Sequence, residues 1–125
     1  MAKFDELPVF KATYDLLFRV FSVSQHWQRD LRYTLGEDLK KEIIEILQLI
    51  YQANASRKKM AFLHSSRVKL VKVQLQLRIA KDLKNLHIKQ YSSLAELTEN
   101  ISKQLSGWEN SCVRKANTKE TNNES

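Results

Sequence analysis

Apolar residues recur every three or four positions along most of the chain, which is the spacing of amphipathic helices. A first helix is predicted from Pro8 to about Gln28, because proline suits the first helical turn and aromatic residues follow at helical spacing. A second helix is predicted to begin at the sequence "TLGE", where Thr34 and Glu37 fit a capping box, and to end near Asn54. Its apolar stripe is Leu35, Leu39, Ile43, Ile46, Ile50 and Ala53.

A strictly alternating stretch, "VKVQLQLRI" from Val71 to Ile79, interrupts this pattern. Alternation is typical of a half-buried strand. However, no other segment supplies a pairing partner, and a lone strand leaves its backbone groups unpaired. We therefore predict a third helix from about Arg57 to about Asn85, on which the apolar residues form two stripes. One is Val68, Val71, Leu75, Ile79 and Leu86, with Leu83 at its edge; the other is Leu63, Leu70, Val73, Leu77 and Ala80.

The two stripes lie on roughly opposite sides of this helix, so only one of them can face a single core. The second stripe has two interpretations. It packs against a second neighbour inside the bundle, or it is covered by another molecule, because large exposed apolar patches mark interaction sites. We expect self-association, with an interface that includes Val71, Leu75, Ile79 and Trp108.

A fourth helix is predicted to start between Ile88 and Ser93 and to end near Arg114, with the stripe Tyr91, Leu94, Thr98, Ile101, Leu105, Trp108 and Cys112. The chain of 125 residues contains only 2 Gly and 1 Pro, too few for the tight turns of a sheet protein. The fold class predicted is all-α, an antiparallel up-down-up-down four-helix bundle over residues 8–114. Residues 1–7 form an N-terminal extension, and residues 115–125 are expected to be a disordered polar tail.

The formal charge of +7 is concentrated in one segment. Between Ser56 and Gln90 there are ten bases and one acid, Asp82, so this segment carries +9 and the remainder −2. Such a run indicates a binder of polyanions; the alternative is a solvated face. The candidate binding residues are Arg57, Lys58, Lys59, Arg67, Lys69, Lys72, Arg78, Lys81, Lys84 and Lys89.

The sequence offers little for catalysis. His26, His64 and His87 lack the spacing of metal ligands, and no Gly-rich phosphate loop or nucleophile motif is present. We expect no enzyme activity, no metal and no cofactor, and we rank a small nuclease or transferase far below a binding role. Cys112 is the single cysteine, so no intramolecular disulfide can form. The sequence shows neither a signal peptide nor an apolar run long enough to span a membrane, and we therefore predict a soluble cytoplasmic protein.

Five segments occur in order along the chain: "YDLLFRVF" (14–21), "YTLGEDLKKE" (33–42), "IYQAN" (50–54), "LRIAKDLKNL" (77–86) and "ISKQLSGW" (101–108). Together they resemble a family of small four-helix-bundle proteins, over residues 7 to about 113. One branch of that family is encoded by intervening sequences in bacterial 23S ribosomal RNA genes. The other is the accessory variability protein, Avd, of diversity-generating retroelements, where the last segment is closer to "LGGW".

The resemblance to the Avd branch implies a basic, non-catalytic homopentamer of four-helix bundles. It also implies binding to reverse transcriptase and, without strong sequence preference, to RNA or DNA, in support of error-prone cDNA synthesis and mutagenic retrohoming. Arg78 matches a helix-three arginine of the family, and Arg67 and Lys81 lie on the same flank. The basic charge favours this branch. The alternative is an orphan bundle of the 23S intervening-sequence type with a structural or interaction role.

Overall fold

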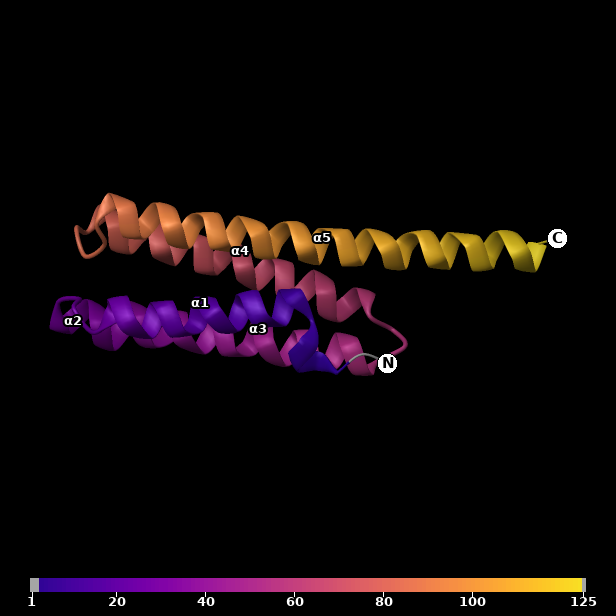
Figure 1. Cartoon of the computed structure of the whole chain (residues 1–125), viewed down its shortest axis with the longest axis horizontal. Helices are drawn as coiled ribbons and strands as arrows, with labels where there is room; N and C mark the ends of the chain where they lie inside the picture. The colour runs from indigo at the N-terminus through magenta and orange to yellow at the C-terminus, as the bar shows by residue number, and fades with distance from the viewer. Residues whose placement is uncertain (1–2, 125) are drawn as a thin grey trace.

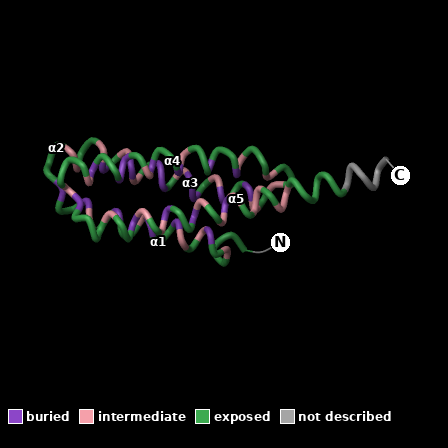
Figure 2. The backbone as a smooth tube through the Cα atoms, turned by 90° about the horizontal axis from the view of Figure 1, so that it is seen from above, coloured by how far each residue is buried: buried purple, intermediate pink, exposed green. Residues whose placement is uncertain are grey.

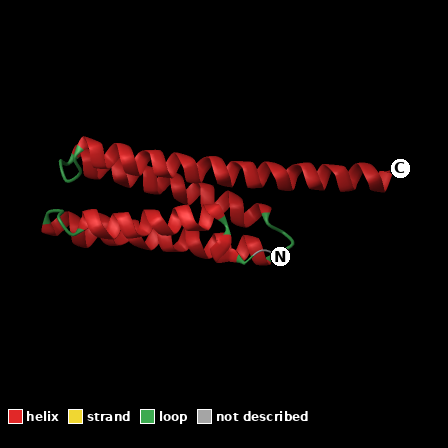
Figure 3. Ribbon diagram, in the orientation of Figure 1, coloured by secondary structure: helices red, strands yellow, loops and turns green. Residues whose placement is uncertain are grey.

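The computed structural model describes the backbone of residues 3–124 and the side chains of residues 3–118. In this part of the chain no residue belongs to a strand (Figure 3). The elements are η1 (Phe4–Glu6), α1 (Pro8–Ser24), α2 (Arg29–Leu31), η2 (Arg32–Gly36), α3 (Glu37–Ala55), α4 (Met60–Asp82) and α5 (Ile88–Glu124). The predicted all-α class is therefore confirmed.

The four long helices α1, α3, α4 and α5 form an antiparallel up-down-up-down bundle, as predicted (Figure 1). α3 packs against α1 and α4, and α5 packs against α4 and α1, so the helices occupy the corners of a square in chain order. The turn between α1 and α2 and the loop between α4 and α5 lie at the same end. There the backbone N–H of Gln28 donates to Asn85 Oδ1 at 2.7 Å and ties the two connections together.

Each long helix turns one apolar face inward, and Figure 2 shows the buried positions along the inner sides of the helices. On α4 this face is the stripe Leu63, Leu70, Val73, Leu77 and Ala80, which is buried in the core that the four helices share. The helical interpretation of the alternating stretch is thus confirmed, and the structure settles which of its two stripes faces the core.

The other stripe of α4 is exposed. We call Val68, Val71, Leu75, Ile79 and Leu83 the aliphatic ridge. All five side chains are exposed to solvent, and Val71 is 63% exposed. α4 therefore does not pack on two sides inside the bundle, and that alternative is wrong for the protomer. Leu86 is the exception, because it lies beyond the end of α4 and is buried.

The predicted capping box at Thr34 is wrong. The chain is already helical upstream of it, running from α2 through the π-helical turn η2 into α3. The Thr34 hydroxyl instead donates to the carbonyl oxygen of Asp30 at 2.7 Å, and Glu37 bonds the amino group of Lys40 at 2.9 Å. Because the preceding turns already supply acceptors for the backbone N–H groups, no free donors remain for Thr34 to cap.

α4 is shorter at both ends than the predicted helix. At its C-terminus Lys84 adopts φ 63°, and the N–H of Asn85 donates to the carbonyl of Ala80 at 2.9 Å, which is a helix-ending motif. At its N-terminus the amino group of Lys59 donates to the carbonyl oxygens of Ala53 (2.8 Å) and Ser56 (2.7 Å) at the end of α3. Arg57, Lys58, Lys59 and Lys84 therefore lie in connections and not on a helix.

The first helix ends at Ser24 and not near Gln28. Its core face is Val9, Leu16 and Val20 with Thr13, whose hydroxyl donates to the Val9 carbonyl at 2.8 Å. The aromatic residues that predicted the helix lie mostly on another side: Tyr14, Phe18 and Phe21 are exposed.

The two termini differ from a simple extension and tail. In the N-terminal segment, the Phe4 ring packs against Phe10 and Tyr51. At the other end α5 continues to Glu124 and projects past the rest of the bundle (Figure 1), whereas a disordered tail is the expectation from position 115. Residues 115–124 contain neither Gly nor Pro to end the helix, and residues 114–118 are exposed. Ser125 lies outside the described residues.

Candidate functional site

The candidate basic residues do not form one continuous stripe, because the middle of α4 is neutralised by acids of α3. Lys69 Nζ lies 2.7 Å from Glu45 Oε2 and 3.5 Å from Glu42 Oε2. Lys72 Nζ lies 3.0 Å from Asp38 Oδ2 and 3.1 Å from Glu42 Oε1. The carboxylate of Glu42 is buried between the two lysines. We call these five residues the paired flank of α4.

Hydrogen bonding within the paired flank shifts four pKa values. The bond from Lys72 lowers the pKa of Asp38, and the bond from Lys69 lowers the pKa of Glu45. Reciprocally, Glu45 raises the pKa of Lys69, and Asp38 raises the pKa of Lys72. Each shift favours the charged form of its group. Lys69 and Lys72 therefore hold α3 to α4, and their charge is largely satisfied within the protomer.

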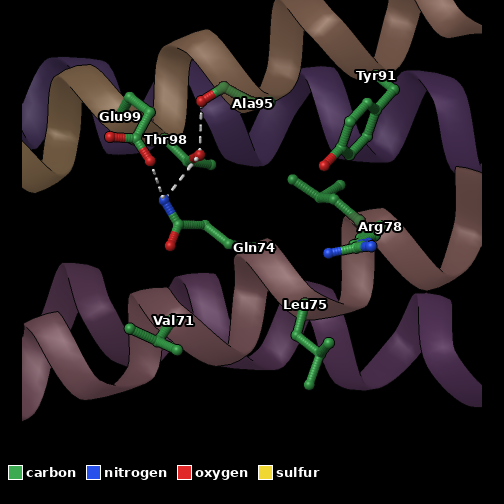
Figure 4. Close-up of a pocket in the computed structure, with 9 residues that line it drawn as sticks. Val71, Gln74, Leu75, Arg78, Tyr91, Ala95, Thr98 and Glu99 are labelled. Carbon is green, nitrogen blue, oxygen red and sulfur yellow. Dashed lines mark hydrogen bonds between the residues drawn. The ribbon is translucent and has the colours of Figure 1, made fainter.

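The opposite side of α4 faces α5 across a groove of about 330 Å³ (Figure 4). Gln74 Nε2 donates to Thr98 Oγ1 at 3.3 Å and to Glu99 Oε1 at 3.1 Å, and Arg78 lies beside Tyr91 in the same groove. Glu99 is the one carboxylate of the lining, and Gln74 already bonds it. The groove therefore offers a contact surface between α4 and α5 whose polar groups Gln74, Thr98 and Glu99 are already bonded to one another.

Three further bases on or near this side have partners of different strength. Arg67 forms a close ion pair with Glu109, at 2.7 Å. Arg78 and Lys81 reach Asp82 only at 3.9 Å and 3.6 Å, and the Lys81 ammonium also lies 4.6 Å from the centre of the Tyr91 ring. The carboxylate of Asp82 is thus shared by Arg78 and Lys81, which leaves a net positive charge at the C-terminal end of α4.

The remaining candidates are exposed at the two ends of the bundle. Arg57 and Lys58 lie in the connection before α4, and Lys84 and Lys89 lie after it. The 23 residues of α4 separate the two pairs by about 35 Å at 1.5 Å per residue. Within residues 3–118, none of these four side chains has an ion-pair partner.

The structure adds basic residues that the sequence analysis missed. Arg29 and Arg32 come from the α1–α2 region, which the Gln28–Asn85 hydrogen bond holds beside the α4–α5 loop. Arg32 donates to the hydroxyl of Tyr33 at 2.7 Å and lies over its exposed ring. The signal in the sequence is the basic and aromatic segment "QRDLRY" (28–33), which lies between the first two predicted helices. We call the following group the basic end: Arg29, Arg32, Arg78, Lys81, Lys84 and Lys89, with Asp30 and Asp82 as its acids.

The predicted interface residues divide between two environments. Val71, Leu75 and Ile79 lie together on the exposed aliphatic ridge. Trp108 does not join them, because it is half-buried and packs against the core from α5. Their role in assembly stays a prediction.

The described residues form no candidate metal site and no helix that could span a membrane. His26, His64 and His87 are all exposed, and in residues 3–118 no three His, Cys, Asp or Glu side chains gather in a way that could hold a metal ion. None of the helices in the described chain combines the length and the apolar content that crossing a bilayer requires.

A four-helix bundle with a groove for contact, a basic end and an exposed apolar ridge defines a protein whose surfaces are suited to binding. A family model described as bAvd-like matches residues 9–112, from the first turn of α1 into α5. The chain therefore belongs to the bAvd-like family, whose members are Avd-type, non-catalytic accessory proteins. No curated protein matches the chain.

Proposed function

We propose that this protein is the non-catalytic accessory subunit of a diversity-generating retroelement. In this role it binds the reverse transcriptase and the template RNA or cDNA in the cytoplasm, as a homo-oligomer, and supports mutagenic copying. Membership of the bAvd-like family supports the accessory role. The net charge of +7 supports a polyanionic partner.

The basic end is the observation that carries the nucleic-acid part of the proposal. It gathers bases from two connections that are far apart in the sequence, and Lys84 and Lys89 are exposed there without an ion-pair partner among the described residues. Phosphate contacts from such side chains supply sequence-independent affinity. The exposed ring of Tyr33 beside Arg32 adds a surface on which an unpaired base can stack.

A comparison of two double variants tests this site. Lys84→Ala with Lys89→Ala removes two charges from the basic end, and Arg57→Ala with Lys58→Ala removes two exposed charges from the other end. In a shift assay with single-stranded RNA at low salt, we expect the first variant to bind at least tenfold more weakly than the parent. Its plot of log affinity against log salt should become shallower by about 2, since about one counterion is released per phosphate contact.

The second double variant is the matched control and should change affinity much less. Equal losses in both variants would contradict a localised site and indicate binding through overall charge. Absence of RNA and DNA binding by the parent protein at about 50 mM salt, a concentration at which phosphate contacts are strong, would remove the nucleic-acid role. The orphan-bundle alternative would then be favoured.

The reverse-transcriptase part of the proposal needs a separate measurement. If a reverse-transcriptase gene lies beside the gene for this protein, co-expression should give a complex that survives purification. We expect the complex to persist after nuclease treatment, because the proposal includes a direct protein contact. Loss of the complex on nuclease treatment would show that the nucleic acid alone bridges the two proteins.

A further inference from the structure

A second exposed apolar surface lies on α1 and α3. We call it the aromatic face; its members are Phe4, Phe10, Tyr14, Phe18, Phe21, Ile44, Leu47 and Tyr51. Phe4, Phe10, Ile44, Leu47 and Tyr51 line a groove of about 530 Å³ on this face. Phe4, Ile44 and Tyr51 are exposed, whereas Phe10 is half-buried and Leu47 is buried at the base of the groove.

The rings of the aromatic face form one connected series. Ring centres are 4.9 Å apart between Tyr51 and Phe4, 5.2 Å between Phe4 and Phe10, 6.1 Å between Phe10 and Tyr14, and 4.9 Å between Tyr14 and Phe18. Phe18 nevertheless remains 58% exposed. Ring contacts within the protomer therefore fix the positions of these side chains and leave one flank of the series open.

The aliphatic ridge and the aromatic face differ in shape and place. The ridge is a single stripe on the outer side of α4, whereas the aromatic face spans two helices and contains a groove. α1 does not neighbour α4 in the square of helices, so the rings on α1 lie away from the ridge, on the far side of α3. From Val68 to Leu83 the ridge covers about 22 Å of helix, and from Phe10 to Phe21 the aromatic stripe covers about 17 Å, so their lengths are comparable.

We propose that the aliphatic ridge of one copy docks into the aromatic face of the next copy. Two different surfaces that pair in this way form a heterologous interface, which closes into a ring when the rotation between copies allows it. This inference rests on the homo-oligomer in the proposed function and assigns residues to its interface. It also explains why one protomer exposes two apolar surfaces instead of one.

Charge favours this pairing over contact between two ridges. Arg78 borders the ridge, its side chain is 68% exposed, and it reaches Asp82 only at 3.9 Å. A two-fold contact between ridges would bring Arg78 of both copies together, which is unfavourable. The aromatic face instead offers the exposed rings of Tyr14 and Phe18, and such ring surfaces attract guanidinium groups.

Complementation between two variants tests the pairing. Val71→Gln with Leu75→Glu blocks the ridge, and Tyr14→Gln with Phe18→Glu blocks the aromatic face; all four side chains are exposed, so circular dichroism should show the parent helicity. By light scattering we expect the parent to assemble and each variant alone to have the mass of one protomer, 14.7 kDa. A mixture of the two should have twice that mass, because one free ridge then meets one free face.

Several results would overturn the proposal. A parent that is monomeric leaves no interface to assign. A face-blocked variant that still dimerises would show that ridges pair with each other, and two monomeric variants that stay monomeric when mixed would show that the surfaces do not meet. These results are separate from the RNA assay: a monomeric parent that binds RNA contradicts only the pairing, and an assembled parent that does not bind RNA contradicts only the proposed function.

Cross-linking gives a second measurement that does not depend on disruption. In a Cys112→Ser background, one tagged copy carries Leu75→Cys and a differently tagged copy carries Phe18→Cys. After co-expression and treatment with a short bis-maleimide, we expect mixed dimers at least tenfold more abundant than dimers of either single copy. Predominant Leu75→Cys homodimers would overturn the proposal.

Discussion

The two apolar stripes of α4 are alike in sequence and opposite in environment. Leu70, Val73 and Leu77 are almost fully buried, whereas Val71 and Leu75 on the aliphatic ridge are more than half exposed. Both stripes are built from branched aliphatic residues at helical spacing. Burial in the protomer therefore depends on which side of the helix meets the other three helices, and a stripe that is equally apolar can remain available for another molecule.

The largest expected difference between the stripes is in stability. Leu77→Ala removes a buried side chain and should lower the free energy of unfolding by about 2–5 kcal/mol at any protein concentration. Leu75→Ala should change the stability of the isolated protomer by no more than about 0.5 kcal/mol. Urea unfolding at two protein concentrations measures both.

At high concentration Leu75→Ala should become destabilising, since it weakens the assembly that stabilises the folded chain by mass action. Leu75→Ala could instead lower the free energy of unfolding as much as Leu77→Ala does, at every protein concentration. That result would contradict the difference between the two stripes. It would mean that the ridge is buried within the protomer.

The next effect concerns the polar flank of α4. Glu42 is buried between Lys69 and Lys72, so Glu42→Ala should cost about 1–3 kcal/mol by leaving both lysines without their shared acceptor. The matched control is Glu37→Ala, which removes an exposed carboxylate from its pair with Lys40 and should cost less than about 0.5 kcal/mol. Equal thermal unfolding midpoints for the two variants would contradict a structural role for the paired flank.

A smaller effect is expected where α4 ends. Lys84 adopts the left-handed conformation that glycine occupies without a Cβ clash. Lys84→Gly should therefore raise the free energy of unfolding by about 0.5–1 kcal/mol while it weakens RNA binding. Denaturant unfolding and the shift assay separate the two consequences. A loss of stability would show that the side chain of Lys84 makes a stabilising contact.

The smallest effect is a dependence of stability on pH. The pKa values of Asp38 and Glu45 are lowered from 3.8 and 4.5, so their contribution is present above those values and is lost as the pH falls through the lowered ones. The pKa values of Lys69 and Lys72 are raised from 10.5, so their contribution is present below 10.5 and is lost as the pH rises through the raised ones.

Thermal unfolding should therefore show a plateau between about pH 5 and pH 10 with lower midpoints on both sides. The effect should be small, because these groups are largely exposed and salt screens them. Lys69→Ala with Lys72→Ala should flatten both limbs. Unchanged limbs in that variant would assign the pH dependence to other groups.

The local spacing of apolar residues predicts the long helices correctly, but it does not predict where they begin and end. The spacing of Leu39, Ile43 and Ile46 predicts α3, but the start of the preceding helical turns at Arg29 escapes prediction, because Thr34 offers a convincing local cap. The candidate site was predicted in part for the same reason. Bases such as Lys84 and Lys89 are evident in the sequence. The position of Arg29 beside them depends on the hydrogen bond from Gln28 to Asn85, two residues that are 57 positions apart in the chain.

The sequence by itself determined the helical class, the order of the helices, the excess of positive charge around α4 and the presence of two apolar stripes on it. Each of these follows from residue type and local spacing. Only the tertiary structure decided that Leu77 is buried and Leu75 is not, that acids of α3 satisfy Lys69 and Lys72, and that the aromatic rings of α1 face outward. The physical reason is that burial and ion pairing depend on which helices become neighbours, and contacts between distant segments set that arrangement.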